Sequence, residues 1–294
     1  MPAKIVTVIG AMGAQGSGVV AGLLQEPEKY HIRAVTRRPD SDAAKNLEAK
    51  GVEIVTADLN DVESLKAAFT GSQGINVAKA AAATPTLEHF IWSTLPNVTK
   101  VSGGKFAVPH FVGKNRVDAY IRQDKNLLAK TTFLWVTWYH DNFKWPMFTP
   151  YFIPTSRKYV QFTSCSPQAV MSTIGDVRKN IGPFVPAILD NPEKTQNGAI
   201  VRGEMATSTS DKLLQTWAAT QGKQALSVQV PAETYYALWP MWAEEMSVML
   251  QFWDEFAEKA WTDPDWTVLS REDLGLSSGN FVDLETSFKQ LDEF

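Results

Sequence analysis

The 294-residue sequence lacks what several protein classes require. Its single cysteine, Cys165, excludes an internal disulfide and is typical of a reducing compartment such as the cytoplasm. Four scattered histidines show no metal-ligand spacing, so we expect no metal site. The net charge is −4 and there is no basic block, so we expect no direct nucleic-acid ligand. No apolar run approaches a membrane span and the N-terminus has no signal pattern, so we expect no membrane association.

What the sequence does contain is a glycine-rich turn between a short apolar strand and a helix-like run. Three glycines are spaced by two residues in this turn: Gly10, Gly13 and Gly16. In a dinucleotide site the first would allow the sharp turn, the second a close approach to pyrophosphate, and the third tight packing of helix on sheet. The start of the helix would offer free N–H groups to the anion. The turn therefore predicts nucleotide binding, with a tight turn that holds no ligand as the alternative.

The end of the second predicted strand indicates which nucleotide. Residues 32–36 run into Arg37 and Arg38, whereas the nearest acid, Asp40, lies further along. NAD sites usually place a carboxylate near this strand end, and NADP sites place an arginine there to meet the 2′-phosphate. We therefore predict NADP(H), with Arg37 as the main contact and Arg38 as the second. Asp58, after the third strand, would lie near the adenine or cap a helix.

Strands and helices alternate along the first half of the chain. We place strands at 4–9, 32–36, 53–57, 88–94 and 132–137, and helices at 15–25, 42–50, 61–69, 73–83 and 110–122. This pattern predicts an α/β fold, a Rossmann-type doubly wound parallel sheet with a smaller mixed α/β substrate-side region. We expect an NADP-binding domain over 1–145 and, interleaved with it, a substrate- or partner-side region over 146–294.

One strand is missing from this alternation. Helix 61–69 is followed directly by helix 73–83, although a doubly wound sheet needs its fourth strand there, beside the first. Omitting an inner strand would leave a gap of about 10 Å. Either the sheet is rebuilt or roughly 20 to 25 residues are absent near 71–73. We predict that the functional protein has this strand and that the present chain lacks it.

Taken together, several motifs resemble the NmrA-like family, an atypical branch of the short-chain dehydrogenase/reductase superfamily, and its fungal members above all. These motifs are the glycine turn, the basic strand end, the run from His110 to Lys114, and Tyr139 with Asn142. The family includes NADP-binding regulators as well as reductases of small molecules. The resemblance implies the following cofactor contacts: Gly10, Met12, Gly13, Ala14, Gln15, Gly16, Arg37, Arg38, Asp58, Leu59, Lys114, Tyr139 and Asn142.

The Tyr-x-x-x-Lys pair of the superfamily is absent, because no lysine has a tyrosine four residues before it. His110 stands where the tyrosine is expected, and Lys114 follows on the same helix face. His110 would donate a proton, or Lys114 would act as acid or base with a lowered pKa, or the site binds NADP without chemistry. His110 as a locally bonded helix-start residue is the plain alternative. Ser93 resembles the strand-end serine of the catalytic set, or merely caps its strand.

Aromatic residues crowd the 18 positions after the cofactor-side strand, which indicates either a pocket for a flat apolar ligand or ordinary core: Trp135, Trp138, Phe143, Trp145, Phe148, Tyr151 and Phe152. Residues 248–261 read as an amphipathic helix whose apolar stripe could bind a partner. We expect an NADP(H)-dependent oxidoreductase acting on a small apolar or aromatic substrate. The alternative is a non-catalytic NADPH sensor that binds a protein partner, for which a nuclear location stays open. The sequence leaves a homodimer open as well.

Overall fold

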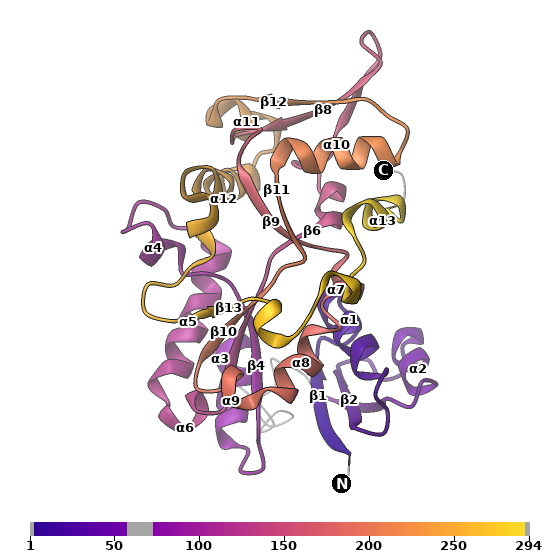
Figure 1. The fold of residues 1–294 in the computed structure, drawn as a ribbon, viewed down its shortest axis with the longest axis vertical. Coiled ribbons are helices and arrows are strands. Elements are labelled where there is room, and N and C mark those ends of the chain that lie inside the picture. Colours follow the sequence, from indigo (N-terminus) through magenta and orange to yellow (C-terminus); the bar gives the residue numbers. More distant parts are fainter. Residues whose placement is uncertain (1–2, 58–72, 292–294) are drawn as a thin grey trace.

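The computed structural model describes residues 3–57 and 73–291 (Figure 1). Two parallel sheets fill the lower part of this view, and two smaller sheets with their helices form the upper part. The α/β fold class predicted from the alternation is therefore confirmed.

The first sheet is parallel and has the order β1-β2-β3. Its elements are β1 (Lys4–Ile9), α1 (Ala14–Leu23), β2 (Tyr30–Thr36), α2 (Asp42–Glu48) and β3 (Glu53–Thr56). Each corresponds to an element predicted from the sequence. The start of α2 follows from local chemistry, because the Ser41 side chain accepts a hydrogen bond from the Ala44 amide and so caps the helix.

The second sheet is also parallel and has the order β13-β10-β5-β4. Its strands and neighbouring helices are α3 (Gln73–Ala83), β4 (Phe90–Thr94), α4 (Val98–Val101), α5 (Pro109–Gln123), α6 (Lys125–Leu128), β5 (Thr131–Val136), β10 (Ala199–Gly203) and β13 (Val268–Leu269). Every residue of β5 is buried, as expected for an inner strand with helices on both faces. The strands β10 and β13 come from the later half of the chain, so residues beyond 145 complete this sheet.

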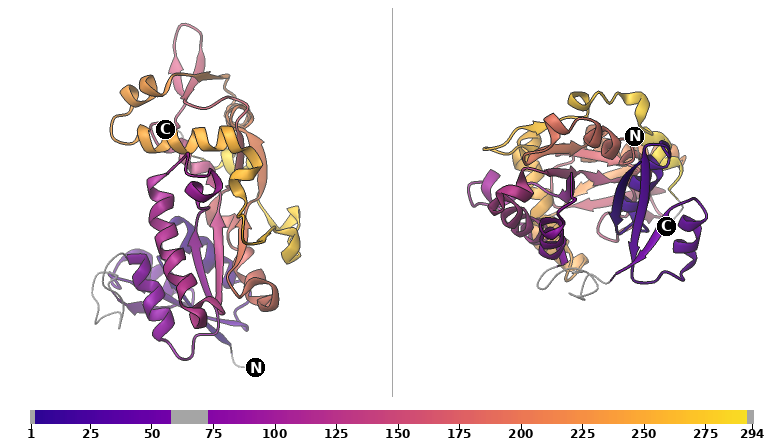
Figure 2. Two further views of the ribbon diagram at one scale, coloured as in Figure 1. Left: turned by 90° about the vertical axis from the view of Figure 1, so that its left-hand side faces the viewer. Right: turned by 90° about the horizontal axis from the view of Figure 1, so that it is seen from below.

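The two sheets are not joined to each other. Within the described part of the chain, β1 pairs only with β2 and β4 only with β5, so an open edge of each sheet lies at the split. In the view from below (Figure 2), the indigo strands of the first sheet form a separate block beside the second sheet. A fourth strand between β1 and β4 would lie at this split. The predicted helix 61–69 falls outside the described residues, and the absence of a strand from this chain stays a prediction.

Helix packing holds the first sheet in place where no strand ladder does. Helix α1 contacts α7 (Val177–Asn180) and α8 (Phe184–Asp190), and the approach is close. A Cβ on Gly22 of α1 would lie 2.3 Å from the carbonyl oxygen of Gly182, so only glycine fits there. A buried cluster that includes Val8, Leu134 and Ile174 continues this contact into both sheets.

The upper part consists of a sheet of order β11-β9-β6 and a sheet of order β12-β8-β7. The remaining strands and helices of the described chain are β6 (Trp138–Tyr139), η1 (His140–Lys144), β7 (Tyr151–Ile153), β8 (Lys158–Thr163), β9 (Val170–Gly175), α9 (Pro192–Thr195), β11 (Ala206–Thr209), α10 (Ser210–Thr220), β12 (Ala225–Gln229), α11 (Ala232–Leu238), α12 (Ala243–Phe256), η2 (Ala257–Trp261), η3 (Glu272–Leu274), η4 (Ser278–Asn280) and α13 (Leu284–Lys289). Helix α12 buries Leu250, Phe252 and Trp253, so most of the apolar stripe predicted for 248–261 is core.

Candidate active site

The glycine turn has the geometry that the sequence analysis expects of it. Gly10 lies in the left-handed region with φ +72°, and the Gly13 amide donates to its carbonyl at 2.8 Å. A Cβ on Gly16 would lie 2.1 Å from that carbonyl oxygen, so the helix can start only with glycine there. The N-cap, Gly13, has no side chain with which to cap α1. The first turn of α1 therefore presents backbone N–H groups suited to an anion.

The basic strand end lies beside this turn. The register pairs Ile9 of β1 with Val35 of β2, so the two strands end next to each other. Arg37 and Arg38 follow directly and are exposed, and the Arg38 amide donates to Thr36 Oγ1 at 3.1 Å. Both guanidinium groups are thus available to a phosphate at the turn. Two further predicted contacts, Asp58 and Leu59, lie outside the described residues.

Gln15 connects three elements at the carboxyl ends of the strands. Its Oε1 accepts from the Ser93 hydroxyl of β4 at 2.8 Å, and its Nε2 donates to the hydroxyl of Tyr139 in β6. The structure therefore brings together three residues singled out from the sequence. They span the split between the sheets, because Gln15 belongs to the first sheet's helix and Ser93 to the second sheet.

Lys114 of α5 reaches the same place from the other side. Its ammonium donates to the Ser93 carbonyl at 2.9 Å and lies 4.7 Å from the centre of the Trp92 ring. Burial lowers the pKa of Lys114, and the charge of Asp118 opposes this shift. A half-buried amine with a lowered pKa can hold a ribose hydroxyl and can also give or take a proton.

Asp118 is a site residue that the sequence analysis missed. Its carboxylate accepts from Trp92 Nε1 at 2.9 Å, from Thr94 Oγ1 at 2.9 Å and from Asn115 Nδ2 at 3.3 Å. Burial raises its pKa to about 6, although these three hydrogen bonds act in the opposite direction. The spacing gave a signal, since Asp118 lies one helical turn beyond Lys114 and shares its face.

His110 lies one turn before Lys114 but is held by a distant residue. Its ring Nδ1 contacts the Glu245 carboxylate of α12, and its amide donates to the same oxygen at 2.8 Å. Glu245 thus caps the start of α5, whose own N-cap Val108 offers no side-chain bond. The local hydrogen bond considered for His110 is replaced by a contact between α5 and α12.

Met12 and Asn142 are further predicted contacts, and each follows the carboxyl end of a strand. Met12 is half-buried within the glycine turn, beside Ala14 at the start of α1. Asn142 is half-buried in η1, three residues after Tyr139, and its carbonyl accepts from the Trp145 amide at 2.9 Å. Both lie where chain segments leave the carboxyl ends of strands, the edge at which open α/β sheets bind ligands.

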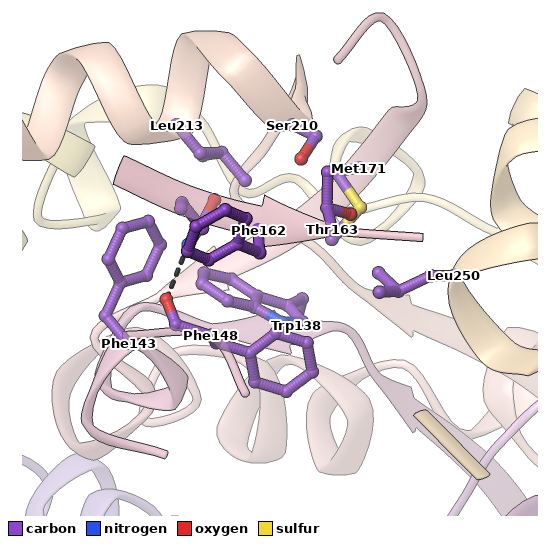
Figure 3. A pocket seen from close by; sticks show the side chains of 10 residues that line it. Trp138, Phe143, Phe148, Phe162, Thr163, Met171, Ser210, Leu213 and Leu250 are labelled. Atoms are coloured by element: carbon purple, nitrogen blue, oxygen red, sulfur yellow. Dashed lines mark hydrogen bonds between the residues drawn. The ribbon is translucent and has the colours of Figure 1, made fainter. Parts of the chain in front are cut away.

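The aromatic residues after β5 divide into two groups. Trp135, Trp138, Phe143 and Phe148 are buried, whereas Trp145, Tyr151 and Phe152 are exposed. Figure 3 shows the cavity that Trp138, Phe143 and Phe148 line from below, with Leu213 of α10 above; its volume is about 20 Å³. Such a volume holds at most a water molecule. The predicted pocket for a flat ligand is therefore closed core here.

Within residues 3–57 and 73–291, no group of histidine, cysteine, aspartate and glutamate is arranged to hold a metal ion. None of the helices described is long and apolar enough to cross a bilayer.

The family model that describes the NmrA-like family matches residues 2–287. This chain belongs to the NmrA-like family. The resemblance seen in the glycine turn, the basic strand end and the His110–Lys114 run is thereby confirmed. An NmrA-like domain-containing oxidoreductase of Aspergillus hancockii is 28% identical over 256 residues, covering 76% of this chain and 75% of its own length. An NmrA-like domain-containing protein of Dictyostelium discoideum is 27% identical over 279 residues, covering 86% and 88%.

Solved structures agree on the fold of this NmrA-like chain. The negative transcriptional regulator NmrA, crystallised with NAD, has a TM-score of 0.78 at 18% identity and covers 99% of this chain and 96% of its own. A triphenylmethane reductase of Citrobacter, complexed with NADP(H), has a TM-score of 0.65 at 20% identity and covers 98% and 100%. NmrA was also crystallised with NADP.

The lengths of the alignments show that the relatives have more residues than this chain over the matched stretches. The aligned stretch with the Aspergillus protein has 256 positions but takes up only 76% of a 294-residue chain. It therefore includes positions where the relative has residues and this chain has none. The Dictyostelium alignment, with 279 positions over 86% of the chain, shows the same shortfall.

The residues present fit the two halves of a dinucleotide unequally. The uncapped N-terminus of α1, the close Gly16 contact and the exposed Arg37 form a cradle suited to the phosphates. On the other side of the split, Lys114 and Gln15 both bond to Ser93. A dinucleotide that extends from the glycine turn across the split to Lys114 would have to compete with Ser93 for these two side chains.

Proposed function

We propose that this NmrA-like chain binds NADP(H) and reduces a small apolar or aromatic substrate. The observation that carries the proposal is the glycine turn at the start of α1, with Arg37 beside it and the half-buried Lys114 opposite. Solved relatives of similar fold support it. Besides the triphenylmethane reductase, an NADPH-dependent quinone oxidoreductase of Escherichia coli has a TM-score of 0.67 at 16% identity.

Each residue has a defined part in this proposal. The amides at the start of α1 bind the pyrophosphate, and Arg37 binds the 2′-phosphate through charge-assisted hydrogen bonds. Lys114 binds the ribose on the nicotinamide side. When bound, the cofactor supplies the hydride.

Among the described residues, Lys114 is the group that we assign to supply the proton. It is half-buried, and desolvation lowers its pKa toward the range useful for proton transfer. His110, the other candidate, is paired with Glu245 through both its ring and its amide, so we assign it to positioning the start of α5.

Calorimetry with NADPH and NADH tests the choice of cofactor. We expect NADPH to bind far more tightly, and Arg37→Asp to erase the preference because it removes an attraction and adds a repulsion. Equal affinities of the unmodified protein for both cofactors would contradict NADP(H) selectivity.

Two further variants test the division of roles on α5. Lys114→Ala is expected to weaken NADPH binding and abolish reduction together, whereas His110→Ala leaves the NADPH affinity nearly unchanged. A loss of binding in His110→Ala with normal binding in Lys114→Ala would reverse the assignment.

A second function is favoured by a different observation: an NADPH-sensing regulator that binds a protein. The chain lacks the usual tyrosine, and Trp145, Met241 and Trp242 expose 52%, 91% and 56% of their surfaces. Normal NADPH binding without NADPH oxidation, over a panel of quinones and aromatic carbonyl compounds, would favour the regulator.

A further inference from the structure

Trp92 of β4 contacts two side chains of α5 in different ways. The Lys114 ammonium lies over its ring, 4.7 Å from the ring centre, and its indole N–H donates to Asp118 Oδ1 at 2.9 Å. A tryptophan attracts a cation through the face of its ring, so the attraction depends on how the ring is turned. The orientation of Trp92 therefore helps to set where the Lys114 ammonium lies.

Asp118 fixes that orientation because its carboxylate is itself fixed. Oδ2 accepts from Thr94 Oγ1 at 2.9 Å and from Asn115 Nδ2 at 3.3 Å, while Oδ1 accepts from the indole N–H. Trp92 and Thr94 are two residues apart on β4, so they lie on the same face of the strand. The carboxylate cannot turn away from Trp92 without giving up its bond to Thr94, which is 2% exposed.

The far edge of the Trp92 ring is closed by α3. A Cβ on Gly74 would lie 2.9 Å from Cη2 of the indole, so the ring packs against helix backbone there. The Phe90 ring is stacked with it, with 6.4 Å between the ring centres and 27° between the planes. The indole is thus held by packing at its benzene edge and by Asp118 at its N–H, and Lys114 lies over its face.

Charged groups on both sides of Asp118 come from α5 itself. Lys114 and Arg122 lie one helical turn before and after it, and its charge raises the pKa of both side chains against the larger effect of burial. The Arg122 guanidinium is stacked on two rings, at 4.3 Å from that of Phe133 and 4.2 Å from that of Trp266. From β4 the carboxylate is met by neutral donors. Its hydrogen bonds are therefore directed at the strand, while its charge acts along the helix.

We propose that Asp118 is a positioning residue for Lys114: it holds the Trp92 ring in the orientation that keeps the ammonium at the carboxyl end of β4. The inference rests on the proposed function in one respect, namely that Lys114 binds the ribose of NADP(H). A ring face needs no particular N–H of the ammonium, so Lys114 can exchange the Ser93 carbonyl for a ribose hydroxyl and stay in place. Trp92 and Asp118 thus keep Lys114 ready without taking part in the reaction themselves.

The pKa of the Lys114 amine, measured without cofactor, tests the positioning. Trace acetylation of the whole protein over a series of pH values, followed by mass spectrometry of the Lys114 peptide, gives this pKa. Asp118→Asn removes the charge but keeps an acceptor for the indole N–H, and it should lower the pKa of Lys114 by about one pH unit. Asp118→Ala also frees the ring, and it should lower the pKa by about half a unit more.

Asp124→Asn is the matched control on the same helix. Asp124 follows the last residue of α5 and caps α6, and asparagine caps a helix as well as aspartate does. It lies about 15 Å from Lys114 along the helix, beyond the reach of a screened charge, so the pKa of Lys114 should stay unchanged. An unchanged pKa in both Asp118 variants overturns the proposal, because a carboxylate that merely ties α5 to β4 would give that result. So does an equal fall in the two variants, which would mean that the carboxylate acts by charge alone.

Trp92→Leu provides a second background in which the ring face is gone. There Asp118→Asn and Asp118→Ala should lower the pKa of Lys114 equally, because no ring is left to turn. A difference between them that persists without the ring overturns the proposal. If Asp118→Ala does not fold, Thr94→Val replaces it, since it loosens the carboxylate and keeps the charge. This variant should also lower the pKa of Lys114, and an unchanged pKa overturns the proposal.

An NADPH titration separates this proposal from the proposed function. Asp118→Ala should weaken NADPH binding by about fivefold, and Asp124→Asn should leave it unchanged. If the unmodified protein does not bind NADPH but the pKa of Lys114 falls as expected, the positioning is retained and NADP(H) binding is rejected. If NADPH binds but the pKa of Lys114 does not respond to Asp118, the reverse holds. An NADPH affinity that Asp118→Ala leaves unchanged, although the pKa falls, overturns the link between the positioning of Lys114 and the cofactor.

Discussion

Strands β1 and β5 have similar apolar sequences but very different surroundings. All six residues of β5 are buried between β4 and β10, whereas Val8 is the one buried residue of β1. Each strand lies in a parallel sheet with helices nearby. The difference arises because β5 has a neighbour on each side and β1 has one, β2, in the described part of the chain.

Two different kinds of contact therefore hold the two sheets. The second sheet is held by its ladders, with β4, β5, β10 and β13 in register. The first sheet is attached to the rest by α1 against α7 and α8, where Gly22 touches Gly182, and by the Gln15 bridge. Burial and close packing, not backbone pairing, join the nucleotide turn to the remaining site.

Truncating matched apolar residues gives the largest expected effect. Leu134→Ala in β5, where Leu134 is 3% exposed, is expected to cost about 3 kcal/mol of unfolding free energy through lost burial and a cavity. Ile5→Ala, in the exposed strand, is expected to cost less than about 0.5 kcal/mol. Urea denaturation measures both, and similar losses in the two variants would show that β1 is as well covered as β5.

The attachment of α1 can be tested with two glycines. Gly22→Ala is expected to cost about 2 kcal/mol, because the new Cβ overlaps the Gly182 backbone and the helix must move away. Gly113→Ala in α5 is the control, since a Cβ there has no atom within 4 Å. It is expected to be neutral or stabilising by up to about 1 kcal/mol. If Gly22→Ala leaves the unfolding free energy unchanged, helix packing is not the main attachment of the first sheet.

His89, just before β4, should make the stability of the protein depend on pH. Burial and then the Lys4 charge lower the pKa of His89 to about 4, and its ring contacts Thr132 Oγ1 at 2.6 Å. Between that value and the ordinary pKa of 6.5, the unfolded chain binds more protons than the folded protein does. The stability of the fold therefore decreases as the pH is lowered. From pH 7 to 5 we expect a loss of roughly 1–2 kcal/mol attributable to His89.

Urea denaturation at pH 7 and at pH 5 checks this expectation. His89→Gln should remove the part of the loss in unfolding free energy between the two pH values that is attributed to His89. His31→Gln, at an exposed position of β2, leaves His89 in place and serves as the control. A slope that is unchanged in His89→Gln would assign the effect elsewhere.

The smallest expected effect concerns the bridge across the split. A double-mutant cycle with Gln15→Ala and Ser93→Ala should give a coupling of about 1 kcal/mol, the usual contribution of a hydrogen bond. The matched cycle pairs Gln15 with Thr132, which lies in β5 and has its own partners, and should give none. A coupling near zero for Gln15 and Ser93 would leave the two sheets joined by packing alone.

The sequence predicted local structure well because local chemistry governs it. The glycine turn requires the positive φ of Gly10 and the close contact of Gly16, and both requirements are visible in the spacing of the glycines. The strands before and after the turn follow from short β-branched runs. The family could also be recognised, because its motifs lie in such local segments.

Other features depended on residues far apart in the chain. Nothing near His110 in the sequence indicates Glu245, which lies on α12 and reaches α5 through tertiary packing. Asp118 could be placed on the face of Lys114, but its raised pKa depends on burial and on Trp92 of β4. The aromatic residues after β5 could not be divided into core and surface without the fold.

The sequence by itself determined the alternation of strands and helices, the nucleotide turn and the basic strand end, because each depends on residues within a few positions of one another. Tertiary structure alone decided that β1 and β4 remain apart, that Gln15 connects them, and that Lys114 bonds to the Ser93 carbonyl. The physical reason is that burial and hydrogen-bond partners are set by neighbours in space, which a linear pattern does not specify.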